Sequence, residues 1–550
     1  MGGKVGIWSK YFLYLLLLVG ILILLYLHFR LSITRYFDAD EFAHLHWGYA
    51  FSIGEKPYSD FFYLFPPFFL YPIAFIMKVF GRTFESLIFA RIFIFISYLS
   101  ILGILGLIVK KMRGTLAALF AVFIFVFLPM PQDKMIEIRP DLVAVFFGLL
   151  GMYLFIISEE NIQHLTYDRN VKKLLNVICL PAQAGYMFSG LSYGLSLAFV
   201  PKTVFFLIPI GIIWVYRIIR GIWANTEPDL IKHILSFGTG LFIPALLILG
   251  FIFWSGEPGL AIYSMTKMAS TVTSILGSKF YMFPSHFFWP TDVYYGFGGF
   301  NPALYATLFI FLTASIVGVL RGVASLSHKE NSRCVSEFLI FGSFYAALYA
   351  FVKIFPLKHA QYWIPLIPFF CFYVGDLFNS ILNIRHAELV SASALSQTLK
   401  QVQGDGKKRL SFVSPGGIFL SLILIGYLTF LGGTVYQSKM KWTNQDTKAK
   451  IGYFLAKIPE NEPVFDLTGE TVFFRDGYYF CCVPYGQYEE GIGFDIPDIK
   501  SEFEKNNTEY VHVGYEGRTG VLLPDQEKYI KENFKSLDTN PFLWQRKITL

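Results

Sequence analysis

The chain has 550 residues, of which 54% are hydrophobic and only 15% are charged. Soluble globular proteins carry about 25% charged residues. This deficit, together with repeated apolar runs of roughly 18 residues or more, predicts a polytopic helical membrane protein. The net charge of +7 is then assigned to basic loops on the inner side of the membrane, and no nucleic-acid partner is expected.

Eleven apolar runs are expected to cross the membrane. Short basic loops such as "KKMRG" and "YDRNVKK" mark the inner side, so the N-terminus is expected inside and the C-terminus outside. The first run is interpreted as a retained signal anchor, because no small-residue cleavage site follows it. The predicted spans lie near residues 11–29, 84–109, 114–129, 141–157, 174–199, 204–220, 234–255, 301–320, 336–354, 362–382 and 412–432.

The segment from Phe62 to Gly81 is also apolar, but it contains three prolines, which break a continuous helix. Counting it as a full span would move every later basic loop to the outer side. We therefore expect one or two helices in the outer interface, within a first outer loop covering residues 30–83.

The stretch "FDADEFAHLHWGY" places titratable side chains directly after the first span. If the chain is helical from Asp40, then Asp40 and His44 share a face, as do Glu41 and His44. Such a cluster could act as a general base, hold a divalent metal ion through Asp40, Glu41 and His44, or do both. The alternative is a solvated helix N-terminus, where acidic residues are favoured by the helix dipole.

Further polar residues fall on the same outer face under this topology. Each has a simpler explanation: Arg139 could pair with its acidic neighbours, Lys202 could extend from a helix end, and His359 could be an interfacial histidine. Together these polar residues indicate an active site at the outer leaflet. The candidates are Glu137, Arg139, Asp141, Lys202, Lys358, His359 and Tyr362.

Two composition changes divide the chain. Residues 385–409 are polar, resemble translated palindromic repeat elements, and are interpreted as an insertion in an inner loop. From residue 436 the sequence is that of a soluble protein, with alternating helix and strand signals up to residue 550. We expect a transmembrane catalytic domain over 1–435 and a small α/β outer domain over 436–550.

The five cysteines show no C-x-x-C pair and no zinc-site spacing. Cys481 and Cys482 are adjacent and would form a disulfide only with strain, so we expect ordinary thiols. The cysteines therefore indicate neither a disulfide framework nor a zinc site.

The first outer loop resembles that of the GT-C superfamily of glycosyltransferases. It is most similar to bacterial relatives of the protein mannosyltransferases, the glycosyltransferase 39 and 83 types, which include the aminoarabinose transferase of lipid A. The shared pattern is an acidic pair, a "G-x-x-P-Y-x-D" turn and a "PP" interfacial helix. "EIRPD", the segment ending at Lys202, and "KHAQYWIP" extend the resemblance over roughly residues 10–435.

The resemblance implies a membrane enzyme that moves a sugar from a polyisoprenyl-phosphate donor to an acceptor hydroxyl with inversion, at the outer face of a bacterial inner membrane. Asp40 would be the general base, and Glu41 would position the acceptor or help to bind a metal. The acceptor would be a protein, a lipid or a glycan. Substrate contacts would come from Arg139, Lys202, Lys358, His359 and Tyr362, with Glu137 and Asp141, and from Tyr58 and Asp60 in the turn.

Three other functions stay open at this point. An oligosaccharide ligase or polymerase would use the same outer face and lipid-linked sugars. A lipid or sugar flippase would favour charges inside the spans and paired interrupted helices. A non-catalytic envelope protein would leave the acidic loop unexplained.

Overall fold

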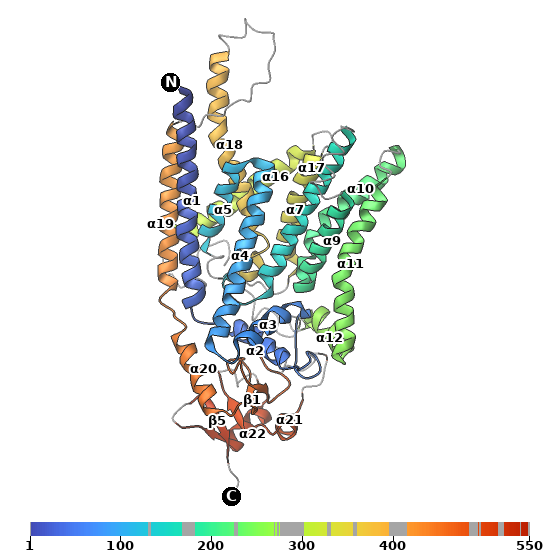
Figure 1. Cartoon of the computed structure of the whole chain (residues 1–550), viewed down its shortest axis with the longest axis vertical. Coiled ribbons are helices and arrows are strands. Elements are labelled where there is room, and N and C mark those ends of the chain that lie inside the picture. Colours follow the sequence, from blue (N-terminus) through green and yellow to red (C-terminus); the bar gives the residue numbers. More distant parts are fainter. Residues whose placement is uncertain are drawn as a thin grey trace.

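The computed structural model describes residues 2–129, 134–167, 182–224, 229–268, 302–326, 332–355, 360–394, 415–482, 497–514, 522–538 and 541–547, with a few isolated residues between them. Long helices run side by side and form most of the molecule, and a small sheet with short helices lies at one end (Figure 1). The N-terminus lies at the opposite end from the C-terminus. This confirms an all-α membrane architecture with a small α/β part.

A helix coincides with each of the eleven predicted spans. Eight segments of the described residues are long and apolar enough to cross a membrane. Two of the remaining spans are shorter apolar helices, α5 and the first part of α18, and α9 has 18 residues. The helices are α1 (Gly2–Thr34), α4 (Phe84–Arg113), α5 (Thr115–Phe127), α7 (Pro140–Tyr167), α9 (Ala182–Phe199), α10 (Ile208–Ala224), α11 (Leu230–Ser255), α16 (Pro302–Leu326), α17 (Ser332–Tyr349), α18 (Ile367–Ala394) and α19 (Pro415–Lys439).

The first outer loop folds into short helices. These are α2 (Ala39–Ser52), the 3-10 turn η1 (Pro67–Phe69) and α3 (Leu70–Phe80). The apolar helix from Pro67 to Phe80 is too short to span a bilayer, for which about 20 residues are needed. The prolines therefore act as the sequence predicts, by preventing one continuous span.

The C-terminal part contains a five-stranded sheet in the order β2-β1-β3-β5-β4. Strand β1 pairs in parallel with β2 and β3, and β5 pairs antiparallel with β3 and β4. The strands are β1 (Pro463–Asp466), β2 (Arg475–Asp476), β3 (Tyr510–His512), β4 (Phe534–Ser536) and β5 (Leu543–Arg546), with helices α20 (Gln445–Lys457), α21 (Ile499–Asn506) and α22 (Pro524–Asn533). A domain boundary at residue 435/436 stays a prediction.

The sheet packs directly against the first outer loop. The Tyr49 ring on α2 lies 5.7 Å from the Phe473 ring. The backbone N–H of Phe62 donates to the carbonyl of Tyr479, and the Tyr479 hydroxyl donates to the carbonyl of Tyr58. The buried core of the sheet includes Phe62 itself. The loop that carries the candidate site is thus held between the helical bundle and the sheet.

The polar segment 385–409 is only partly described. Helix α18 continues to Ala394, so the first ten of these residues extend the helix. Residues 395–409 lie outside the described residues. The interpretation of an inserted loop stays a prediction.

Candidate active site

The acidic stretch forms the N-terminus of α2 because its side chains cap their own backbone. The Asp38 carboxylate accepts from the N–H of Asp40, and the Glu41 carboxylate accepts from the N–H of Asp38. This is a capping box, which satisfies N–H groups that a helix otherwise leaves without partners. The sequence "DADE" therefore fixes where α2 starts and how Asp40 projects from it.

Glu41 is fully buried and serves as a junction between segments. It accepts hydrogen bonds from Arg91 Nε at 2.9 Å and Arg91 Nη2 at 2.7 Å, and from the N–H of Ile138 at 3.1 Å. Arg91 in turn donates to the backbone carbonyls of Ser32, Arg35 and Tyr36. Because both oxygens of Glu41 already have partners, these contacts favour a positioning role over the predicted contact with acceptor or metal.

The predicted outer-face residues Asp40, Arg139, Asp141, Lys202 and Tyr362 lie together. Arg139 Nη1 donates to Asp40, and Arg139 Nε donates to Asp141 at 3.3 Å. Lys202 Nζ lies 2.5 Å from Asp141 and 3.9 Å from the centre of the Tyr362 ring. Three segments far apart in sequence thus form one chain of alternating charges.

Exposure differs along this chain. The Asp40 side chain is 38% exposed, whereas those of Asp141 and Lys202 are 4% and 19% exposed. Burial would raise the pKa of Asp40, but the positive charge of Arg139 outweighs it and holds that pKa below its usual value. Burial opposes the charge of Arg139, yet Asp40 and Asp141 raise its pKa above the ordinary value. Asp40 is therefore an ionised, accessible carboxylate beside a permanent cation.

Glu137 belongs to a neighbouring ion-pair group. Its carboxylate accepts from Lys134 Nζ at 2.6 Å and lies 3.5 Å from Arg35 Nη1. Burial raises the pKa of Glu137 to about 7, against the opposing charge of Lys134. Glu137 therefore borders the Asp40 chain, and a substrate contact for it stays a prediction.

His44 lies among aromatic rings and does not form a metal site with Asp40 and Glu41. The rings of Phe65 and Phe69 each lie 5.2 Å from His44, and burial lowers its pKa to about 3, so the imidazole is neutral at pH 7. Glu41 is held by Arg91 and Asp40 by Arg139. This donor set does not fit a divalent ion, and we assign no chemical step to one.

The prediction of ordinary thiols at Cys481 and Cys482 is wrong, because the two form a disulfide. Cys482 adopts a φ of 68°, a conformation that few residues other than glycine take. Both cysteines are buried beside Trp47. With His46 they are the one group of three close metal-ligating residues in the described part of the chain, but their sulfurs are bonded to each other.

His46 joins α2 to the sheet. His46 Nε2 lies 2.8 Å from Asp476 Oδ1 on β2, with 1% and 5% of the side chains exposed. Burial would lower the pKa of His46, but the charge and hydrogen bond of Asp476 raise it to about 9. This pair therefore anchors the middle of α2 at neutral pH.

Tyr58 and Asp60 build the turn after α2. Tyr58 is buried with a φ of 72°, and its hydroxyl donates to the carbonyl of Phe65. Asp60 accepts from the N–H of Lys56 at 2.8 Å. These contacts are structural, so substrate binding by either residue stays a prediction. Lys358 and His359 lie outside the described residues.

Sequence reasoning missed Arg91, Lys134 and Arg35. The sequence could have indicated a role for Arg91, because a charged residue inside a predicted membrane span is costly and is expected to have a specific partner. Its 50-residue separation from Glu41 hid which partner that is.

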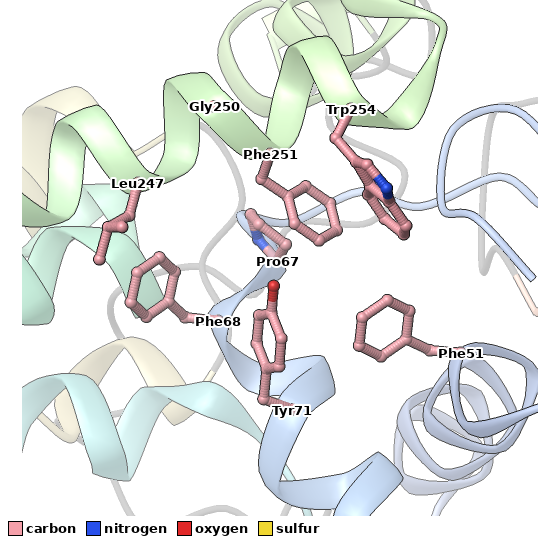
Figure 2. Close-up of a pocket in the computed structure, with 8 residues that line it drawn as sticks. All are labelled: Phe51, Pro67, Phe68, Tyr71, Leu247, Gly250, Phe251 and Trp254. Atoms are coloured by element: carbon pink, nitrogen blue, oxygen red, sulfur yellow. The ribbon is translucent and has the colours of Figure 1, made fainter. Parts of the chain in front are cut away.

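An apolar cavity of about 550 Å³ adjoins this region (Figure 2). Aromatic rings from α2, η1, α3 and α11 project into it, and it opens between these elements. The Phe68 ring contacts the ring of Phe199, which lies three residues before Lys202. The cavity therefore begins close to the charged chain. It is lined by Phe51, Pro67, Phe68, Tyr71, Leu247, Gly250, Phe251 and Trp254.

These features define a polytopic helical membrane protein with a small sheet at one end (Figure 1). No protein-family model matches the chain, and no curated protein matches it in sequence. The fold is similar to that of ArnT, an aminoarabinose transferase, from Cupriavidus metallidurans bound to undecaprenyl phosphate, with a TM-score of 0.57, 12% identity, and coverage of 97% of this chain and 98% of that chain.

Two archaeal structures are also similar. The apo oligosaccharyltransferase of Archaeoglobus fulgidus has a TM-score of 0.52 and 13% identity, covering 98% of this chain and 75% of that chain. The oligosaccharyltransferase AglB of the same organism, in complex with an inhibitory peptide and a dolichol-phosphate, has a TM-score of 0.52 and 12% identity, covering 98% of this chain and 74% of that chain. At these identities the likeness establishes the GT-C fold.

Proposed function

We propose that the protein is an inverting glycosyltransferase that moves a sugar from a polyisoprenyl-phosphate donor to an acceptor hydroxyl at the outer face of a bacterial inner membrane. The observation that carries this proposal is the chain Asp40–Arg139–Asp141–Lys202, in which the accessible carboxylate of Asp40 pairs with Arg139 and the buried carboxylate of Asp141 lies between Arg139 and Lys202. The similar ArnT and AglB structures hold undecaprenyl phosphate and dolichol-phosphate, which supports a lipid-phosphate donor.

Asp40 is the proposed general base. Inversion is a single displacement, in which one base removes the acceptor proton while the sugar–phosphate bond breaks. The leaving lipid phosphate gains negative charge, and Arg139 and Lys202 can stabilise it inside a region of low dielectric. Phosphate binding would also draw Arg139 away from Asp40. The pKa of Asp40 would then rise, which makes it a better base only when donor is present.

The apolar cavity suits the start of the prenyl chain. Its aromatic walls are provided by α2, η1, α3 and α11, and Phe68 connects it to the end of α9 beside Lys202. A lipid phosphate at Lys202 could therefore extend its first isoprene units into this space. This placement agrees with a donor drawn from the bilayer.

The first experiment compares wild type with Asp40→Asn in nanodiscs. Radiolabelled polyprenyl-phosphate sugars are supplied with acceptor extracts, and release of polyprenyl phosphate is followed. Loss of a general base should reduce turnover by about a hundredfold or more. Asp525→Asn is the matched control, because Asp525 is an exposed carboxylate in the first turn of α22.

Two results would contradict the proposal. Normal turnover by Asp40→Asn would remove its role as base, and Asp141 would be tested next. In proteoliposomes, transfer of labelled lipid across the bilayer without donor consumption would establish a flippase in place of the enzyme. Lipid-phosphate-linked oligosaccharides belong in the donor panel, because the similar archaeal structures are oligosaccharyltransferases, one of them with a dolichol-phosphate.

A further inference from the structure

A second pocket, which is polar, lies at the ends of the helices farthest from α2. Its volume is about 260 Å³, and it lies between α4, α16, α17 and α18. Arg113 is the last residue of α4, whereas Arg91 near the start of that helix contacts Glu41. The helical rise between them places this pocket about 30 Å from the candidate active site. We call it the arginine pocket; its charged or hydroxyl-bearing lining residues are Arg113, Arg321, Arg333, Glu337, Asp376 and Ser380.

The inner wall of the arginine pocket is a network of ion pairs. Arg113 Nη2 donates to Glu337 at 2.6 Å, and Arg113 Nε lies 2.8 Å from Asp376. Arg321 donates to Asp376 at 2.7 Å and to the Ser380 hydroxyl at 3.0 Å. The side chains of Arg113 and Asp376 are 6% and 2% exposed. These contacts fix the orientation of the guanidinium groups around the cavity.

The pocket carries an excess of positive charge. Three arginines line it against two carboxylates, and both carboxylates are engaged by Arg113 and Arg321. Arg333 is exposed at the start of α17 and pairs with no carboxylate in the part of the chain that the structure describes. If the network served packing alone, we would expect a third carboxylate among the described residues to balance the charge of Arg333. Its surplus charge instead favours an anion.

The surface beside the pocket is apolar. Leu320 and Val323, on either side of Arg321 along α16, are 64% and 61% exposed, and Ile381, next to Ser380 on α18, is 52% exposed. In a bilayer such side chains contact acyl chains. A ligand that combines a negative headgroup with hydrocarbon chains would match both surfaces.

We propose that the arginine pocket binds the phosphate headgroup of an anionic phospholipid, at the membrane face opposite the candidate active site. Basic pockets between transmembrane helices at the cytoplasmic side are a recognised form of lipid site. Guanidinium groups also bind phosphate in a bidentate manner. The headgroup contacts Arg333 and the free edge of Arg321, while its acyl chains lie along α16 and α18. This site is independent of the proposed transferase activity.

Native mass spectrometry of the full-length protein in detergent tests this proposal. Phosphatidylglycerol and phosphatidylcholine are titrated separately, and bound lipid is counted. We expect one tight phosphatidylglycerol site that phosphatidylcholine does not fill. Arg333→Gln should weaken it about fivefold, which corresponds to about 1 kcal/mol per basic residue. Arg321→Gln gives a second reading, since Arg113 still pairs with Asp376 in that variant.

Lys110→Gln is the matched control, an exposed basic residue at the same end of α4 that does not line the pocket. An equal loss in this variant would indicate diffuse surface attraction and overturn the proposal. Equal binding of the two lipids would also overturn it. Displacement of the lipid by millimolar inorganic phosphate would assign the pocket to a free anion instead.

Discussion

Glu41 and Arg91 form a two-point ion pair in which neither side chain is exposed, and the same arginine holds the backbone that leads from α1 to α2. Breaking a buried ion pair by removing one partner costs about 3–5 kcal/mol, because the other charge is left without compensation. We therefore expect Arg91→Met to lower the free energy of unfolding by about this amount. Denaturant titration of the purified protein in detergent measures it.

The double variant Glu41→Gln/Arg91→Met separates the ion pair from general packing. It removes both charges, so it should be more stable than Arg91→Met alone. If the losses in free energy of unfolding caused by Glu41→Gln and Arg91→Met simply add in the double variant, the two residues do not interact and the ion pair is contradicted. Because the Asp40 side chain is partly exposed and Arg139 keeps Asp141 as a partner, Asp40→Asn should change stability much less than Arg91→Met does, while affecting turnover.

Lys202 is expected to act on donor binding. A charge-assisted hydrogen bond contributes about 1.5–3 kcal/mol, so Lys202→Gln should raise the KM for the lipid-phosphate donor roughly 10- to 100-fold. The assay is initial-rate kinetics over donor concentration. Lys78→Gln is the control, because Lys78 is exposed in the last turn of α3. An unchanged KM would contradict phosphate binding by Lys202.

The pair of His46 and Asp476 predicts a pH dependence of stability. The pKa of His46 is about 9 in the fold and 6.5 ordinarily, so its contribution is complete below pH 6.5 and is lost as pH rises through 9. The shift corresponds to about 3 kcal/mol. Unfolding measured from about pH 6 to about pH 10 should show this loss in wild type. In His46→Gln that part of the slope should vanish; an unchanged slope would exclude the pair as its source.

The disulfide between Cys481 and Cys482 predicts a labelling pattern. In denaturant without reductant, a thiol reagent should modify the thiols of Cys334 and Cys371. Peptides containing Cys481 and Cys482 should be two hydrogen atoms lighter than the dithiol and should react only after reduction. Mass spectrometry of the digested protein detects both the labelling and the mass difference. Modification of these two cysteines before reduction would contradict the bond.

Much of the fold could be predicted from sequence, for a definite reason. A run of about 20 apolar residues is sufficient by itself to specify a spanning helix, so the spans follow from local composition. The start of α2 could also be located, because the caps at Asp38 and Glu41 are local. The grouping of Asp40 with Arg139 and Lys202 followed from topology, which sorts loops onto one face.

The partners of individual side chains could not be predicted in the same way. Several basic residues were predicted on the same outer face as Glu41, and only the folded position of α4 brings Arg91 to it. His46 and Asp476 are 430 residues apart, a separation at which no local pattern operates. The bond between Cys481 and Cys482 depends on a backbone conformation that the sequence does not reveal.

The contacts that hold α2 also set an order of events during synthesis. His46 and Tyr58 receive their partners, Asp476 and Tyr479, from segments more than 400 residues later in the chain. A ribosome must therefore finish the helical bundle and deliver the sheet strands before the acidic helix reaches its final position. A chain that ends after α19 would keep the contacts of Asp40 with Arg139 and of Glu41 with Arg91, but it would lack the contacts to Asp476 and Tyr479 that hold the middle of α2 and the turn after it. Full anchoring of α2 therefore waits for the C-terminal sheet, and membrane insertion alone does not provide it.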